Sequence, residues 1–198
     1  MQSFRISNIR FSTSERIDLV KAWFGLSLAF SLLFSRSFDT SFIIVFVIIM
    51  LTAGIGFLLH EIAHKVSAIY YGHKAEFVAD DKMLLAAIVM ALFLPIVFAA
   101  PGAVYIRGLV TNKQNGIISV VGPWTNLVLA LLFLPLAILG SGIVQMIGAF
   151  GFSINSWLAL FNMFPIPPLD GSKVWAWNKI VYAITIITAG LFTFVAFF

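Results

Sequence analysis

The stretch His60-Glu61-Ile62-Ala63-His64 lies inside an apolar run that extends over residues 42–71. Residues four apart in a helix share a face, so His60 and His64 can present two imidazoles to one metal ion. Glu61 lies one position further along, where it can reach a water molecule on that metal. This is the HExxH arrangement of two zinc ligands and a carboxylate general base. The alternative, histidines that make only local polar contacts, leaves costly polar groups in an apolar span without a function.

Composition indicates that the lipid bilayer is the main partner of this chain. Hydrophobic residues make up 61% of the 198 positions and charged residues only 10%, whereas soluble proteins carry about 25% charged residues. The net charge of +4 comes from basic residues scattered among apolar spans, so no nucleic-acid partner is expected. The chain has no cysteine, which leaves His, Asp and Glu as metal ligands.

Hydropathy predicts an all-α polytopic membrane protein. Five apolar segments are long enough to span, at about 19–35, 41–71, 117–139, 143–164 and 178–198. A sixth segment, 83–100, contains Pro95 and is followed by a stretch rich in Gly and Pro that suggests extended backbone. We therefore expect about five to six transmembrane helices with a re-entrant, membrane-embedded segment that has room for a β-strand. Residues 1–198 are expected to form a single domain.

A catalytic zinc ion needs a third protein ligand besides His60 and His64, with water in the fourth position. Asp170 follows the proline-rich stretch 164–169, which holds the backbone extended just after an apolar span. Rigid non-helical backbone at membrane depth is expected only beside a cavity or inside protein, so Asp170 is the predicted third ligand. The alternative is that Asp170 only caps the helix that follows. Glu76, Asp80 and Asp81 are also near the histidines in sequence, but Asp80 and Asp81 share a patch with Lys74 and Lys82 that indicates a solvated loop.

Three motifs together resemble the site-2 protease family of intramembrane zinc metalloproteases. They are HEIAH at 60–64, GPWTN at 122–126, and NMFP at 162–165 leading to LDG at 169–171. The resemblance covers about residues 41–175, the expected catalytic core, and implies one Zn²⁺ per chain on His60, His64 and Asp170. It implies a minimal form without PDZ or CBS modules, in which Asn126 supports the site.

Two further features of the expected site leave alternatives open. Asn162 is a predicted catalytic residue, as oxyanion donor or substrate anchor, although an interhelical hydrogen bond is an equal alternative. Gly122 and Pro123 are expected to open a span. The extended stretch Pro101, Gly102, Ala103 and Val104 is a predicted substrate-binding strand edge, unless Pro101-Gly102 forms an ordinary surface turn.

Charge predicts the orientation in the cell membrane. With residues 83–100 re-entrant, all basic residues except Arg36 share one side, and that side is cytoplasmic by the positive-inside rule, as is the N-terminus. They are Arg5, Arg10, Arg16, Lys21, Lys65, Lys74, Lys82, Arg107, Lys113, Lys173 and Lys179.

The sequence therefore predicts a membrane-embedded zinc metallopeptidase of the HExxH type. Its expected substrates are transmembrane or membrane-anchored proteins, cleaved within or near their spans. Two alternatives stay open: a membrane metal-ion transporter, which needs several weak sites along a path, and a non-catalytic client-binding membrane protein, which would have no use for Glu61.

Overall fold

A computed structural model describes residues 9–35, 39–94, 97 and 101–197. In chain order the elements are α1 (Thr13–Phe34), α2 (Thr40–Ile49), the π-helical turn η2 (Met50–Gly54), α3 (Ile55–Tyr70), β1 (Lys74–Ala79), α4 (Asp81–Phe93), β2 (Gly102–Arg107), α5 (Asn112–Leu139), α6 (Gly142–Asn162), α7 (Asp170–Trp177) and α8 (Lys179–Phe197).

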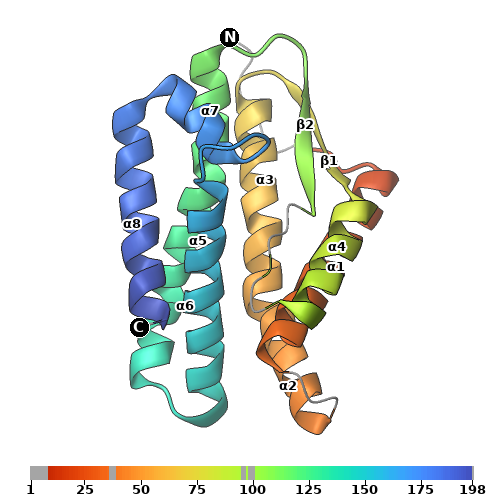
Figure 1. Ribbon diagram of the computed structural model, residues 1–198. Coiled ribbons are helices and arrows are strands. Elements are labelled where there is room, and N and C mark those ends of the chain that lie inside the picture. Colours follow the sequence, from red (N-terminus) through yellow and green to blue (C-terminus); the bar gives the residue numbers. More distant parts are fainter. Residues whose placement is uncertain (1–8, 36–38, 95–96, 98–100, 198) are drawn as a thin grey trace.

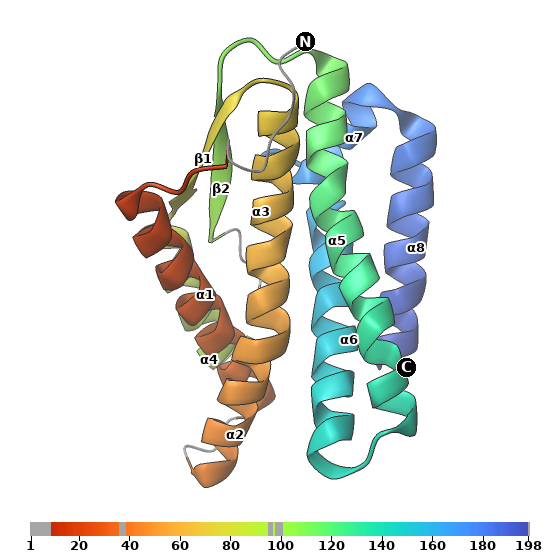
Figure 2. The same ribbon diagram turned by 180° about the vertical axis from the view of Figure 1, so that it is seen from behind.

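Five helical segments of the described chain are long and apolar enough to cross a membrane: α1, the continuous helix formed by α2, η2 and α3, and α5, α6 and α8. The predicted fold class, a helical polytopic protein with a small strand-containing segment, is confirmed. Helices α5, α6 and α8 form one half of the bundle, and α1, α4 and the α2–α3 helix form the other (Figures 1 and 2). Helix α3, which carries HEIAH, belongs to the second half and packs against α5 of the first half.

The long helix that carries HEIAH changes to π-helical geometry at η2, before the turn that carries His60 and His64. A π-helical turn frees backbone groups from the α-helical pattern, and such turns are frequent at functional sites. The indole nitrogen of Trp23 donates to the carbonyl oxygen of Met50 over 3.0 Å. Gly54 lies against the same indole, with no room for a side chain. Helix α1 therefore packs closely against this turn.

Strands β1 and β2 form an antiparallel pair in which Ala79 lies opposite Gly102. Residues 80–101 therefore leave and return at the same end of the pair, as the re-entrant prediction requires. Within them, α4 has 13 residues, a length of about 20 Å at 1.5 Å per residue, which is short of a bilayer core of about 30 Å. Pro95 lies outside the described residues.

The start of α5 corrects one expectation from the sequence. Thr111 and Gln114 form a capping box, in which each side chain accepts a hydrogen bond from the other's backbone N–H, and this box starts the helix at Asn112. Pro123 consequently lies in the helix interior. The prediction that Gly122 and Pro123 open a span was wrong, because the polar first two turns belong to the same helix.

The strand pair, α7, the end of α3 and the start of α5 lie at one end of the bundle, and the α5–α6 turn lies at the other (Figure 1). The positive-inside rule predicts that the first end is cytoplasmic. Arg5 and Arg36 lie outside the described residues.

Single cysteines test this orientation, because the native chain has none. Cysteines at Lys74 and Lys113 should react with an impermeant thiol reagent only from the cytoplasmic side, and a cysteine at Ser141 only from the opposite side. Reaction of the Lys113 position from outside would contradict the re-entrant arrangement.

Candidate metal centre

Three electronegative atoms from two distant parts of the chain converge beside α3. The Nε2 atoms of His60 and His64 lie 2.9 Å apart. Oδ2 of Asp170 lies 3.3 Å from Nε2 of His60 and 3.0 Å from Nε2 of His64. All three residues are buried. Donor atoms around a tetrahedral zinc ion lie roughly 3.3–3.5 Å apart, given bonds of about 2.0–2.2 Å. The two Nε2 atoms and Oδ2 therefore need to move only slightly farther apart to hold a zinc ion.

The second nitrogen of each imidazole has a fixed acceptor. Nδ1 of His60 lies 2.6 Å from Oδ1 of Asn126, and Nδ1 of His64 lies 2.7 Å from the carbonyl oxygen of Ile118. A neutral imidazole that donates through Nδ1 has a bare lone pair on Nε2. Both lone pairs therefore face each other and the Asp170 carboxylate, and a cation between them removes the repulsion. Histidine ligands to metals are held in this way.

The charge on Asp170 leads to the same conclusion. Burial acts to raise the pKa of this carboxyl group, but positive charge at His64 holds the pKa well below its usual range. The carboxylate thus depends on positive charge between it and the imidazoles, and a divalent cation would supply that charge. The three residues fit zinc.

The orientation of Asn126 is set by a chain of buried amides. Its amide nitrogen donates to Oδ1 of Asn155 over 2.9 Å and to the carbonyl oxygen of Gly56 over 3.3 Å. The Asn155 amide in turn donates to the carbonyl oxygen of Gly151 over 2.8 Å. Because both Asn126 donors are used, its oxygen faces His60. Sequence reasoning missed Asn155, although an amide in the middle of an apolar span is a signal of function or packing.

Two glycines allow the helices to approach closely at the metal centre. A Cβ atom at Gly122 of α5 would lie 2.6 Å from Nε2 of His60, and one at Gly56 of α3 would lie 2.9 Å from Cγ of Asn155. Real Cβ atoms essentially never approach this closely, so a larger residue at Gly122 must displace the two imidazoles, and one at Gly56 must displace Asn155. This is the physical role of Gly122 in the GPWTN motif.

Helix α7 delivers Asp170 to the histidines. The residue before it, Leu169, is the N-cap and makes no side-chain cap, and the Asp170 carboxylate faces His60 and His64. The alternative that Asp170 only caps the helix was wrong. Gly171 packs against the Met163 and Phe164 carbonyls, so the turn closes tightly. Nζ of Lys173, one turn along α7, lies 3.4 Å from Oδ1 of Asp170 and leaves Oδ2 for the metal.

A cavity of about 80 Å³ lies over the three ligands. Its lining includes Glu61, Asn162, Lys173 and three predicted strand residues, Gly102, Ala103 and Val104. Sequence reasoning gave Lys173 no role at the site. The Asn162 amide donates to the Leu158 carbonyl of its own helix over 2.9 Å, so the interhelical alternative does not describe this bond.

The remaining acidic candidates and Pro101 lie away from the metal ligands. Asp80 caps α4, and its N–H donates to the carbonyl oxygen of Pro101, which closes the β1–β2 pair. Asp81 pairs with Lys21, and Glu76 accepts from Ser12. Pro101 therefore belongs to the paired backbone and not to a free surface turn.

Apolar helices that bring three buried, zinc-compatible side chains together are the features of a membrane metalloprotein. The chain is 40% identical over 182 residues to a protein of Methanocaldococcus jannaschii named "Putative zinc metalloprotease MJ0611", and the match covers 90% of this chain and 92% of that protein. It therefore belongs to this zinc metalloprotease family. A Bacillus subtilis protein named "Putative zinc metalloprotease YwhC" is 28% identical over 144 residues, 63% of this chain and 66% of that protein. No family model and no solved structure matches the chain.

Purified protein should contain about one zinc ion per chain, as a three-ligand catalytic site requires. His60→Ala, His64→Ala and Asp170→Ala should each lose the metal, measured by mass spectrometry of the metal in size-exclusion fractions. Full zinc content in Asp170→Ala would contradict its place as third ligand.

Asn126→Leu should weaken zinc binding by about 10–100-fold, the usual effect of removing the partner of a metal-binding histidine. Competition with a chelator of known affinity measures the change. Thr125→Val is the matched control, because the Thr125 hydroxyl bonds only the Val121 carbonyl of its own helix among the described contacts. Equal affinities of the two variants would refute the orienting role of Asn126.

Proposed function

We propose that this chain is an intramembrane zinc protease of the HExxH and site-2 protease type, which cleaves membrane-anchored proteins within or near their spans. The observation that carries the proposal is the position of the metal ligands. His60 and His64 lie in the helix Thr40–Tyr70, which is long and apolar enough to cross a membrane, and Asp170 follows a second such helix, Gly142–Asn162. The Asp170 carboxylate contacts both imidazoles. Glu61 lines the same cavity.

The side chains around the cavity supply the parts of a hydrolytic reaction. Zinc held by His60, His64 and Asp170 would lower the pKa of a water bound to it and would polarise a carbonyl group. Glu61 takes a proton from the attacking water and transfers it to the leaving amine. We assign Asn162 and Lys173 to the stabilisation of negative charge that develops on the substrate; both line the cavity and both carry N–H donors, which supports this role.

Backbone groups of β2 offer a binding site for an extended substrate. The N–H groups of Phe77 and Ala79 point out of the pair from β1, toward α1. In an antiparallel pair, the residues opposite them also turn their backbone groups outward. These residues are Val104 and Gly102, and by alternation Ile106, and all three line the metal cavity. A substrate strand added at this edge places its carbonyl groups beside the ligands.

An apolar groove continues from the metal cavity. It has a volume of about 890 Å³ and shares Gly102, Ala103, Pro168 and Leu169 with the cavity lining. Its other walls include Tyr105, Phe161, Phe164 and Ile166. Such a groove favours apolar substrate residues on one side of the cleaved bond, as a transmembrane segment supplies. The localisation proposed is the cell membrane, with a cytoplasmic N-terminus.

Glu61→Gln tests the reaction. The variant should fold and keep zinc, because Glu61 is not a ligand, and cleavage should fall by about 10²–10⁴-fold, the usual contribution of general-base catalysis. The assay co-expresses the chain with a panel of single-span proteins and resolves cleavage products by immunoblot. Undiminished cleavage by Glu61→Gln would refute this mechanism, and zinc flux into vesicles that depends on Glu61 would favour the transporter.

A further inference from the structure

The two edges of the β1–β2 pair have different surroundings. The outer edge of β1 is covered by α1: the N–H of Phe77 donates to Oε1 of Glu15 over 3.0 Å, and the N–H of Ala79 donates to Oδ2 of Asp18 over 3.2 Å. The two carboxylates lie three residues apart on one helix and meet N–H groups two residues apart on the strand. They occupy the donors that another strand needs in order to pair with β1.

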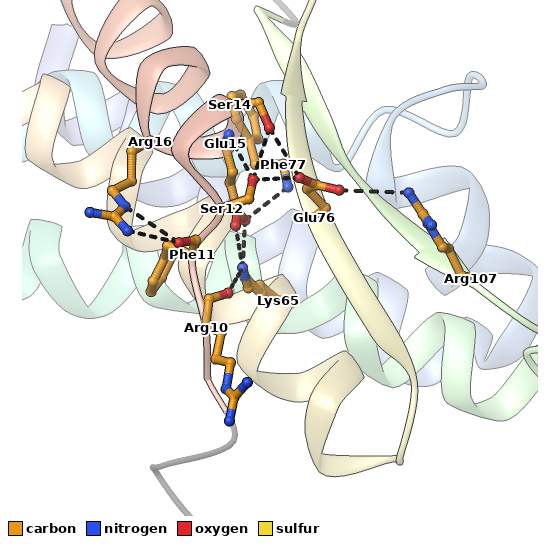
Figure 3. Close-up of polar contacts among 10 residues, drawn as sticks. All are labelled: Arg10, Phe11, Ser12, Ser14, Glu15, Arg16, Lys65, Glu76, Phe77 and Arg107. Atoms are coloured by element: carbon orange, nitrogen blue, oxygen red, sulfur yellow. Dashed lines mark hydrogen bonds and ion pairs between the residues drawn. The ribbon is translucent and has the colours of Figure 1, made fainter.

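Glu15 is held by an ion pair with the metal-binding helix (Figure 3). Nζ of Lys65 donates to Oε1 of Glu15 over 2.6 Å and to the Arg10 carbonyl over 2.7 Å. The side chains are only 3% and 1% exposed, for Lys65 and Glu15 respectively. Two buried charges are costly unless their hydrogen bonds are satisfied. Lys65 directly follows His64 in α3. The Glu15 carboxylate therefore accepts hydrogen bonds from α3, through Lys65, and from β1, through the N–H of Phe77.

From these contacts we propose that Glu15 and Asp18 are positioning residues of the protease reaction. They close the outer edge of β1, which directs an extended substrate to the free edge of β2. The Glu15–Lys65 pair also fixes the distance between the strand pair and the helix that carries His60 and His64. The inference rests on the proposed function and extends it to α1, which lies outside the motif-bearing residues 41–175.

A role in stability alone makes a different prediction, and a pair of double variants separates the two. Glu15→Gln/Lys65→Met and Glu15→Leu/Lys65→Met both lack the ion pair without leaving an unpaired charge. Gln keeps an oxygen that can accept from the N–H of Phe77, and Leu does not. The edge-closing role therefore distinguishes the two variants, whereas a role of the ion pair in stability affects them equally.

The probe is a designed single-span reporter with a 20-residue Leu/Ala span, a central Gly-Ser pair and a soluble tag at each end. Mass spectrometry of the products gives the cleaved bond, and initial rates give kcat and KM at equal zinc content. The Leu variant should be slower in kcat than the Gln variant by roughly 10–100-fold, because a displacement of about 1 Å can cost that much in rate. It should also spread cleavage over neighbouring bonds.

Equal rates and the same single cleaved bond in both double variants would overturn the inference. If either double variant fails to hold zinc, Asp18→Asn and Asp18→Leu repeat the comparison at the partly exposed Ala79 end of β1, with the same outcomes. Failure of the proposed function is recognised separately, because the unaltered chain then cleaves the reporter no faster than Glu61→Gln does.

Discussion

Three acceptor atoms that face one another at about 3 Å inside an apolar bundle stay together only if positive charge lies between them. Nε2 of His60, Nε2 of His64 and Oδ2 of Asp170 are such atoms. Unpaired acceptors that are buried side by side cost free energy, and a bound metal ion would offset that cost. Much of the surrounding structure serves this arrangement. Gly122 leaves space beside the imidazoles, and Asn126 and the Ile118 carbonyl fix their orientation.

The proposed proteolysis in a membrane adds a second constraint, because a substrate helix conceals its own carbonyl groups. Among the described residues, the edge of β2 is open beside the metal cavity while α1 covers the edge of β1, and we propose that this meets the constraint. The buried Glu15–Lys65 pair joins this sheet to the metal-binding helix. In the proposed function, the metal site, Glu61 and the strand edge are thereby held in one unit, and α1 helps to position them.

Local patterns in the sequence predicted much of this arrangement. Hydropathy located the long helices, helical spacing paired His60 with His64, and the proline-rich stretch before Asp170 marked it as a ligand. Contacts between distant residues could not be predicted in this way. Asn155 and Lys173 show their roles only when α5, α6 and α7 are packed together. The start of α5 was placed too late because its first turns are polar, and Glu15 gave no local sign of its partner fifty residues away.

X-ray absorption at the zinc edge of the purified protein is a direct test of the metal centre, because it reports the atoms bound to the metal. We expect a four-coordinate spectrum with two imidazole nitrogens at about 2.0–2.1 Å and oxygen ligands at about 2.0–2.2 Å. In Asp170→Asn the imidazole contribution should persist in any residual bound zinc, with a changed oxygen shell. A spectrum with fewer than two imidazoles, or one unaltered by Asp170→Asn, would contradict the account.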